Sequence, residues 1–170
     1  TTWYKVAAGG NFSLALKTDG TLWAWGENTY GQLGLNIAYY QRKSSPVQIG
    51  ALTNWAKISA KPYNSAAIKT DGTLWTWGRN GYGELGDQTT FNRSSPVQVG
   101  ALTTWNNVSC AWQSTAATKT DGTLWTWGEN GSGQLGLGNT TNYSSPKQVG
   151  ALTTWGLVAG GQQFMLFLKY

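Results

Sequence analysis

A phrase of eleven residues occurs three times in this chain, and this repetition limits what the chain can fold into. Leu16 to Gly26 reads Leu-Lys-Thr-Asp-Gly-Thr-Leu-Trp-Ala-Trp-Gly and returns with few changes at 68–78 and 118–128. An anchoring tryptophan stands at positions 3, 55, 105 and 155, so the period is about 50 residues. We therefore divide the chain into units 3–54, 55–104 and 105–154 and a partial fourth unit, 155–170.

Each unit reads as strands and turns. A period of about 40 to 50 residues built from strands is typical of propeller blades, whereas helical repeats would space apolar residues by 3.6. In the first unit, Val6 to Leu16 predicts one strand of a hairpin and Thr21 to Trp25 the next, with a short later strand at 46–50. Asp19-Gly20 suits a two-residue turn with positive φ. We therefore interpret Asp19, Asp71 and Asp121 as turn-formers.

The second strand of the hairpin is apolar on both faces. Alternation places Trp23 and Trp25 on one face and Leu22 and Ala24 on the other. A strand with two apolar faces must be covered on both sides, as it is between neighbouring blades. Ten of the 11 tryptophans stand at repeat positions, so we predict that they anchor the core.

A glycine-rich segment follows this strand, from Gly26 to Gly34 in the first unit. Together with the Leu-Trp-x-Trp hairpin, its Gly-x-Asn-x-x-Gly-Gln-Leu-Gly pattern, clearest at 127–136, resembles the regulator of chromosome condensation repeat family. The resemblance implies an all-β fold, a β-propeller of about seven four-stranded blades. It does not imply one function, because the family includes a nucleotide exchange factor on chromatin, an ultraviolet receptor, a β-lactamase inhibitor and many bacterial and phage repeats.

Two departures from the family pattern restrict the function. The family often places His after the first glycine of each unit, where this chain has Phe12, Asn64, Ser114 and Phe164. The ultraviolet receptors resemble one another through a Gly-Trp-Arg-His-Thr phrase, to which 111–115, Ala-Trp-Gln-Ser-Thr, is the nearest approach. Since the arginine of that phrase is missing, we do not expect a light receptor.

Three units and part of a fourth are fewer than the ring needs. Two blade faces would remain open, each with apolar side chains that a folded protein rarely leaves bare. We therefore predict that these residues are part of a larger ring, with further copies of the chain closing the ring as the alternative.

The inventory of reactive side chains is small. The chain has no His, one Cys and seven acidic residues, which argues against zinc sites, catalytic triads and any cofactor site. Glu84 and Asp87 are the close pair of acids outside the turns, and we interpret them as surface loop charge. The position shared by Glu27, Arg79 and Glu129 is interpreted as solvated. Cys110 is predicted to be a small buried residue, and we predict that the chain is not an enzyme.

The net charge of +5 raises the question of nucleic-acid binding. Four lysines, Lys17, Lys69, Lys119 and Lys169, share one repeat position beside the turns. Charges spaced in this way predict a solvated rim, whereas nucleic-acid sites gather Lys and Arg on one face beside stacking aromatic residues. The longest apolar run, 164–168, is far too short for a membrane span.

Comparison between the units separates framework residues from variable ones. Trp112 replaces Gly10, Pro62 and Gln162, so the framework does not require it. The long loops 35–43, 87–93 and 137–143 vary as well. Tyr and Arg are favoured contact residues. The candidate binding residues are Trp112, Tyr63, Gln113, Tyr39, Tyr40, Arg42, Phe91, Arg93 and Tyr143, with tolerated substitution as the other interpretation of the loop positions.

We therefore predict a non-enzymatic propeller module that contacts a protein partner or further blades of the same assembly. The similarity of its units favours a bacterial surface protein or a phage structural or fibre protein, which would place it on a cell surface, on a virion or outside the cell. One alternative is a signalling propeller of the exchange-factor or chromatin-binding type. The other is a glycan-binding module built on Trp112 and the Tyr-rich loops.

Overall fold

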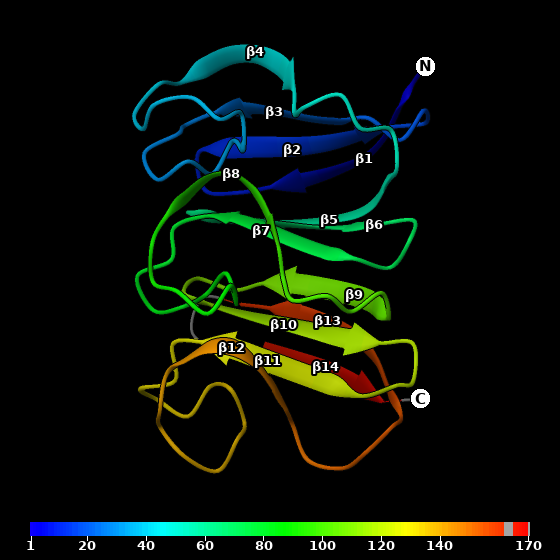
Figure 1. Cartoon of the computed structure of the whole chain (residues 1–170), viewed down its shortest axis with the longest axis vertical. Coiled ribbons are helices and arrows are strands. Elements are labelled where there is room, and N and C mark those ends of the chain that lie inside the picture. Colours follow the sequence, from blue (N-terminus) through cyan, green and yellow to red (C-terminus); the bar gives the residue numbers. More distant parts are fainter. Residues whose placement is uncertain (162–164, 170) are drawn as a thin grey trace.

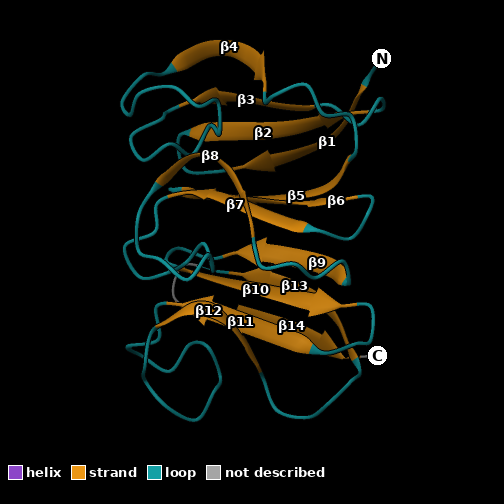
Figure 2. Cartoon of the chain, in the orientation of Figure 1, coloured by secondary structure: helices purple, strands orange, loops and turns teal. Residues whose placement is uncertain are grey.

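The computed structural model describes residues 1–161 and 165–169, and these residues form strands, turns and loops without a helix (Figure 2). Phe164 lies outside the described residues. The strands form antiparallel sheets: the three four-stranded sheets lie one after another along the long axis of the molecule, and the last, two-stranded sheet overlaps the third in this view (Figure 1). Each complete sheet has four strands in the order in which the chain makes them, which is the arrangement of a propeller blade.

The sheets follow the repeat. The first contains β1 (Trp3–Ala8), β2 (Phe12–Lys17), β3 (Leu22–Gly26) and β4 (Lys43–Gln48). The second contains β5 (Trp55–Lys61), β6 (Asn64–Lys69), β7 (Leu74–Gly78) and β8 (Arg93–Gln98). The third contains β9 (Trp105–Cys110), β10 (Ser114–Lys119), β11 (Leu124–Gly128) and β12 (Tyr143–Gln148). The last pairs β13 (Trp155–Gly160) with β14 (Met165–Lys169).

The segment predicted as the first strand of the hairpin is two strands. β1 ends at Ala8 and β2 begins at Phe12, with a tight turn between them in which the Gly9 amide donates to the Phe12 carbonyl over 2.9 Å. The Gly9-Gly10 pair marks this break, because consecutive glycines weaken a strand and favour a turn. The fourth strand also begins earlier than predicted, at Lys43.

The Asp-Gly segment forms the predicted turn, but the turn is longer than predicted. The Gly20 amide donates to the Lys17 carbonyl, and the Lys17 amide donates to the Thr21 carbonyl, both over 3.0 Å. Only Gly20 has a positive φ, 76°, so this is a three-residue loop with glycine in the left-handed region. Asp19 Oδ1 accepts from the Thr21 amide and hydroxyl, and that hydroxyl accepts from Trp23 Nε1. The same bonds recur in the next two units, which confirms the aspartates as turn-formers.

Neighbouring sheets are joined by the glycine-rich segments, which we call the signature loops (26–34, 78–86 and 128–136). The signature loop of the first unit lies on the second sheet, where the Gln32 carbonyl accepts from Trp77 Nε1 over 3.0 Å and from Ser65 Oγ over 2.8 Å. Gly34, with φ at 69°, lies so close to the Trp77 indole that a Cβ there would be 2.7 Å from its nitrogen. The main chain of the first signature loop thus packs on the second unit, and that of the second packs on the third, where the Glu84 carbonyl accepts from Trp127 Nε1 over 3.0 Å.

The lysines beside the turns are not a solvated rim, contrary to our prediction. Lys69 and Lys119 are both only 8% exposed. Their Nζ atoms lie 3.8 Å and 3.7 Å from the ring centroids of Trp75 and Trp125, and burial lowers the pKa of both. The ammonium groups therefore cover tryptophan faces and contribute to packing through cation–π contacts. The side chain of Lys169 lies outside the described residues.

Cys110 is a buried residue of β9, 1% exposed, beside Ser59. Burial raises the pKa of its thiol to about 12, so almost no thiolate exists at neutral pH. We expect a disulfide reagent at pH 8 to modify the folded chain at least about a hundredfold more slowly than the chain unfolded in denaturant. The rate can be followed by absorbance, and similar rates in the two states would contradict the buried position.

Candidate protein-binding face

The variable segments gather at one end of the blades. The turn between the first two strands of each sheet is fastened to the loop that follows the third strand, because the Arg79 amide donates to the Tyr63 carbonyl and the Glu129 amide to the Gln113 carbonyl, both over 2.8 Å. The long loops start from the same place, on the left in Figure 1. We call this the variable end; the Asp-Gly hairpins and the connections 49–54 and 99–104 lie at the opposite end.

The nine candidate residues all come from segments of the variable end, but the structure divides them into two groups. The turn residues Tyr63, Trp112 and Gln113 take part in one continuous cluster. The long-loop residues are spread along the end of the three sheets; they are Tyr39, Tyr40, Arg42, Phe91, Arg93 and Tyr143.

Aromatic rings from all three units form a row at the centre of the cluster. The Tyr30 ring meets the Tyr63 ring at a centroid distance of 5.2 Å, and the Tyr63 ring meets Trp112 at 5.9 Å, both edge to face. All three rings are half-buried. Beyond Trp112 lies a pocket of about 300 Å³ that Lys61 and Pro62 also line. A row of rigid, partly exposed aromatic side chains is a favourable surface for binding a protein.

Arg79 lies among these rings. Its guanidinium carbon is 5.4 Å from the Tyr82 centroid, 5.8 Å from Tyr63 and 5.9 Å from Tyr30. Its side chain is 22% exposed, so part of the charge is available at the surface. The cation is held by three π faces, which keeps a long side chain in place before any partner binds.

Gln113 connects Arg79 to the third unit. With its amide in the orientation that satisfies both neighbours, its oxygen accepts from Arg79 Nη1 and its nitrogen donates to Glu129 Oε2, each over 2.9 Å. Gln134 donates to the same carboxylate oxygen over 2.9 Å. Polar groups that satisfy one another in this way fix the geometry of a surface at the junction of two units.

Glu84 lies beneath Arg79 and is fully buried, so its interpretation as surface loop charge was wrong. Its Oε2 accepts from the Tyr82 amide over 2.7 Å, while its Oε1 accepts no hydrogen bond from the described residues and lies 4.0 Å from Arg79 Nε. Burial raises the pKa of this carboxyl group, against the opposing effect of that amide and of Arg79. Glu84 stands at the signature position that is Gln32 and Gln134 in the other units, where the amide oxygen accepts the equivalent backbone bond.

Asp87 is not surface charge either. Its side chain is 3% exposed, and its Oδ2 pairs with Arg93 Nη2 over 2.7 Å. Arg93 is thereby held inside its own loop. Tyr143 is also partly buried, against the core between the second and third sheets. Arg93 and Tyr143 are therefore less free to contact a partner than the sequence suggested.

The other long-loop candidates face outward. Tyr40 and Phe91 are 74% and 72% exposed, and Arg42 is exposed as well. Tyr39 is less open, because its hydroxyl donates to the Asn92 carbonyl of the next unit over 3.2 Å. Exposed aromatic side chains around the cluster extend the contact surface.

Sequence reasoning missed three members of the cluster, Tyr30, Arg79 and Tyr82. A signal existed, because position 79 is Arg where the neighbouring units have Glu27 and Glu129. We interpreted this variation as solvation, but Arg79 and both glutamates are half-buried. A charge reversal next to two tyrosines at junctions between units indicates a cross-unit contact better than it indicates solvent.

The structure is similar to solved structures of known proteins. Among solved structures, Prp20p from Saccharomyces cerevisiae, described with its binding to Gsp1p and histones, superposes with a TM-score of 0.86 at 22% identity over 99% of this chain and 44% of that one. Yeast RCC1 (Prp20), bound to Kap60, superposes with a TM-score of 0.87 at 22% identity over 99% of this chain and 42% of that one. These likenesses show the fold, which is an all-β segment of a β-propeller.

Sequence relatives agree with the fold. The probable E3 ubiquitin-protein ligase HERC4 of Rattus norvegicus is 38% identical over 84 residues, 48% of this chain and 8% of the ligase. The RCC1 domain-containing mitochondrial protein RUG3 of Arabidopsis thaliana is 32% identical over 89 residues, 52% of this chain and 20% of that protein. The chain thus spans a minor part of each relative.

The family pattern of the regulator of chromosome condensation (RCC1) repeat matches residues 19–68, 71–118 and 121–168. A second pattern of the same repeat matches residues 3–32 and 55–84. Together with the signature loops and the sheets that they join, these matches identify the fold family. The chain belongs to the regulator of chromosome condensation (RCC1) repeat family.

Proposed function

We propose that this chain is a non-enzymatic protein-binding module of an RCC1-type propeller and that the variable end carries its contact surface. One observation carries the proposal. Around Arg79, side chains that the repeat framework does not require come together from three units into a rigid surface of Tyr, Trp and Arg. These residue types dominate the binding energy of protein interfaces.

The relatives support a protein partner. Yeast RCC1 (Prp20) is bound to Kap60 in one structure, and Prp20p is described with Gsp1p and histones. HERC4 is named as a probable ubiquitin ligase. None of these relatives supports the bacterial surface or virion assembly that the sequence first favoured. They favour its alternative, a signalling or chromatin-binding propeller, and this chain would supply part of its binding surface.

Site-specific photo-crosslinking tests the proposal. A photoreactive residue is placed at position 112 on the variable end or at position 52 on the opposite end, where Leu52 is 47% exposed. In cells of the source organism, we expect protein adducts from position 112 and few from position 52. Adducts from position 52 alone, or none above background at position 112, would overturn the proposal.

Truncation of the cluster is expected to weaken binding of the crosslinked partner. Arg79→Ala and Trp112→Ala should each raise the Kd at least about tenfold, because truncating a central Arg or Trp contact typically costs about 2 kcal/mol or more. Leu52→Ala is the matched control and should leave the Kd unchanged. Calorimetry or interferometry with the purified partner measures the effect. If Trp112→Ala abolished glycan binding without changing protein binding, the glycan alternative would replace this proposal.

A further inference from the structure

Three positions of each unit lie together at the variable end, and their chemistry changes together. One belongs to the turn between the first two strands, and the other two belong to the signature loop, one and six residues after its first glycine. We call each group of three a charge set. The charge sets are Asn11, Glu27 and Gln32 in the first unit, Tyr63, Arg79 and Glu84 in the second, and Gln113, Glu129 and Gln134 in the third. The reversal of charge at Arg79 is therefore accompanied by a change at both other positions.

In the third unit the charge set holds an acid. Glu129 Oε2 accepts from Gln134 Nε2 and from the side-chain amide of Gln113, both over 2.9 Å. The oxygen of Gln134 is occupied by the Ser132 amide, 3.0 Å away, so its NH₂ group is the part that faces the carboxylate. Hydrogen bonds to an ionised acceptor are stronger than those between neutral groups. Both amide side chains are thus placed as donors to a negative charge.

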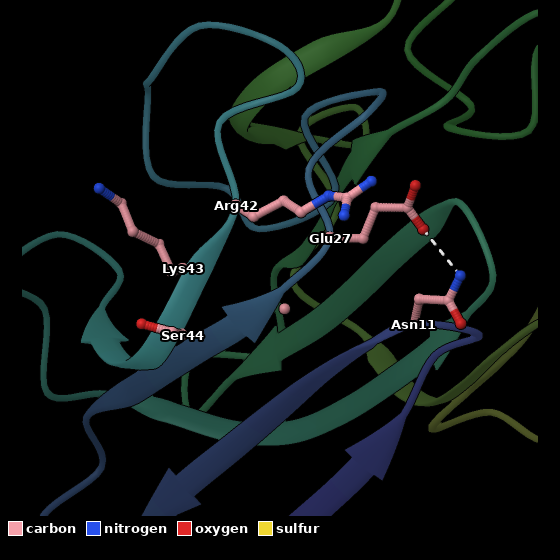
Figure 3. Close-up of a pocket in the computed structure, with 6 residues that line it drawn as sticks. Asn11, Glu27, Arg42, Lys43 and Ser44 are labelled. Atoms are coloured by element: carbon pink, nitrogen blue, oxygen red, sulfur yellow. Dashed lines mark hydrogen bonds between the residues drawn. The ribbon is translucent and has the colours of Figure 1, made fainter.

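The first unit also holds an acid, with one change of donor. Asn11 Nδ2 donates to Glu27 Oε2 over 3.0 Å (Figure 3), and the Thr29 hydroxyl donates to Oε1 over 2.6 Å. Gln32 Nε2 makes no hydrogen bond among the described residues, so Thr29 supplies the second donor. The bonds from Thr29 and Asn11 lower the pKa of Glu27 below its ordinary value, which keeps this carboxyl group charged at neutral pH.

In the second unit every group around the central position suits a cation. Glu84 places a carboxylate oxygen 4.0 Å from Arg79 Nε, and Tyr63 offers an aromatic ring, 5.8 Å from the guanidinium carbon, where the other units have an amide. Opposite charge and a π face both favour a positive group. Since the Tyr82 amide occupies Glu84 Oε2, a glutamine here would turn its NH₂ group toward the guanidinium, donor against donor.

We propose that each charge set determines the sign of the charge that its unit presents at the variable end, and that the reversed set of the second unit makes Arg79 the residue that selects a carboxylate of the protein partner. This selection rests on the proposed function of the variable end. Tyr63 and Glu84 are positioning residues, because they act on the partner only through Arg79.

The carboxylate that Arg79 selects is a single one. The Arg79 side chain is 22% exposed, and its contact with Glu84 is long, so the guanidinium can pair with an acid from outside. The equivalent positions of the neighbouring units are the acids Glu27 and Glu129. A continuous acidic segment would therefore meet like charge on both sides of Arg79. The partner that fits has one carboxylate flanked by neutral or basic groups.

A double-mutant cycle on the chain alone tests the charge set of the second unit. The parent, Glu84→Gln, Arg79→Glu and the double variant are compared by denaturant titration at pH 8. Glu84→Gln should raise the folding equilibrium constant at least about fivefold more when position 79 is glutamate than when it is arginine, because two facing carboxylates are then replaced by the pair found in the third unit. Proximity of a new carboxylate to Glu129 cancels, since both chains with glutamate at position 79 share it. Equal gains in the two backgrounds would overturn the proposal.

The third unit provides the mirror cycle, which decides the question even where Arg79→Glu fails to fold. Gln134→Glu should lower the folding equilibrium constant when position 129 keeps its glutamate, because two acids then face each other. Together with Glu129→Arg, the same substitution should cost at least about fivefold less. Equal losses in the two backgrounds would show that these positions do not act as a set.

Binding of the partner crosslinked at position 112 tests the selection of a carboxylate. In the Glu84→Gln background, Arg79→Glu should raise the Kd at least about tenfold above that of Arg79→Gln, because the partner carboxylate then meets a like charge. Equal Kd values would overturn the selection but leave protein binding at the variable end intact. If position 112 captured no partner, the proposed function and the selection would fail together, whereas the two cycles would still decide the charge sets.

A positioning role is separated from a purely structural one by the direction of two effects. Glu84→Gln alone should raise the Kd about threefold or more while the chain becomes more stable, which a folding defect cannot explain. Tyr63→Phe keeps the ring beside Arg79 and should leave the Kd unchanged. An unchanged Kd in Glu84→Gln would remove Glu84 from the positioning residues and overturn this part of the proposal.

Discussion

Trp77→Ala is expected to lower the free energy of unfolding by about 3–5 kcal/mol, the usual cost of removing a large buried aromatic side chain. Trp77 is fully buried between the first signature loop and its own sheet. The substitution leaves a cavity beneath Gly34 and removes the donor to the Gln32 carbonyl. It therefore affects the junction between two units as well as the core of one.

The chain offers an internal control for this prediction. Trp25→Ala changes the equivalent residue of the first unit, where no loop covers the indole, and should cost about 1–2 kcal/mol from the smaller area that it buries. Denaturant titration with intrinsic fluorescence, supported by hydrogen exchange in case the units unfold separately, measures both losses. Equal losses at the two sites would mean that the docked loop contributes nothing to the stability of Trp77.

Glu84→Gln is expected to stabilise the chain at neutral pH by about 1–3 kcal/mol, because the neutral amide carries no charge that burial must strip of water. Glu84 is buried, and its Oε1 accepts no hydrogen bond among the described residues. Gln occupies the same position in the other two units and keeps the bond to the backbone amide. The substitution also removes the ion pair with Arg79. That pair is long, 4.0 Å, and the Arg79 side chain is partly exposed and can be solvated instead.

The raised pKa of Glu84 fixes the direction in which the stability of the chain changes with pH. Burial raises the pKa of Glu84 in the folded chain above its ordinary value of 4.5, so the folded state binds more protons than the unfolded state between these two values. The protonated Glu84 carboxyl group therefore contributes to the free energy of unfolding fully below pH 4.5, and this contribution is lost as the pH rises through the raised pKa. Glu84→Gln should remove this decline. Glu129→Gln, a half-buried control, should retain it, and a decline of the same size in Glu84→Gln would contradict the assignment.

Much of the fold could be predicted from the sequence because the repeat displays each structural role three times. The blade period, the Asp-Gly turns and the two-sided burial of the Trp-x-Trp strand follow from residue patterns alone. The division of 6–16 into two strands was missed because its small residues fit a strand throughout, and only Gly9-Gly10 signals the break. The length of the turn depends on φ at Asp19, which the sequence does not reveal.

The candidate face was predicted only in part, for a physical reason. Trp112 and Tyr63 were found because they differ from their equivalents in the other units. Arg79 and Glu84 were misinterpreted because charged residues are usually exposed, and their burial depends on contacts across the junction of two units. The positions of Lys69 and Lys119 were misjudged in the same way, since Trp75 and Trp125 meet them across the Asp-Gly turn, a contact that residue spacing alone did not indicate.

The docking of the first and second signature loops on the sheets that follow them has an evolutionary consequence. The stretch between two tryptophan anchors encodes one sheet, but the loop that packs on that sheet is encoded in the stretch before it. Unequal recombination that duplicates any window of one full period, wherever it starts, nevertheless adds one complete blade and one complete junction. Such a gene can gain or lose blades without a privileged breakpoint, and sequence drift at the variable end is then free to differentiate the copies.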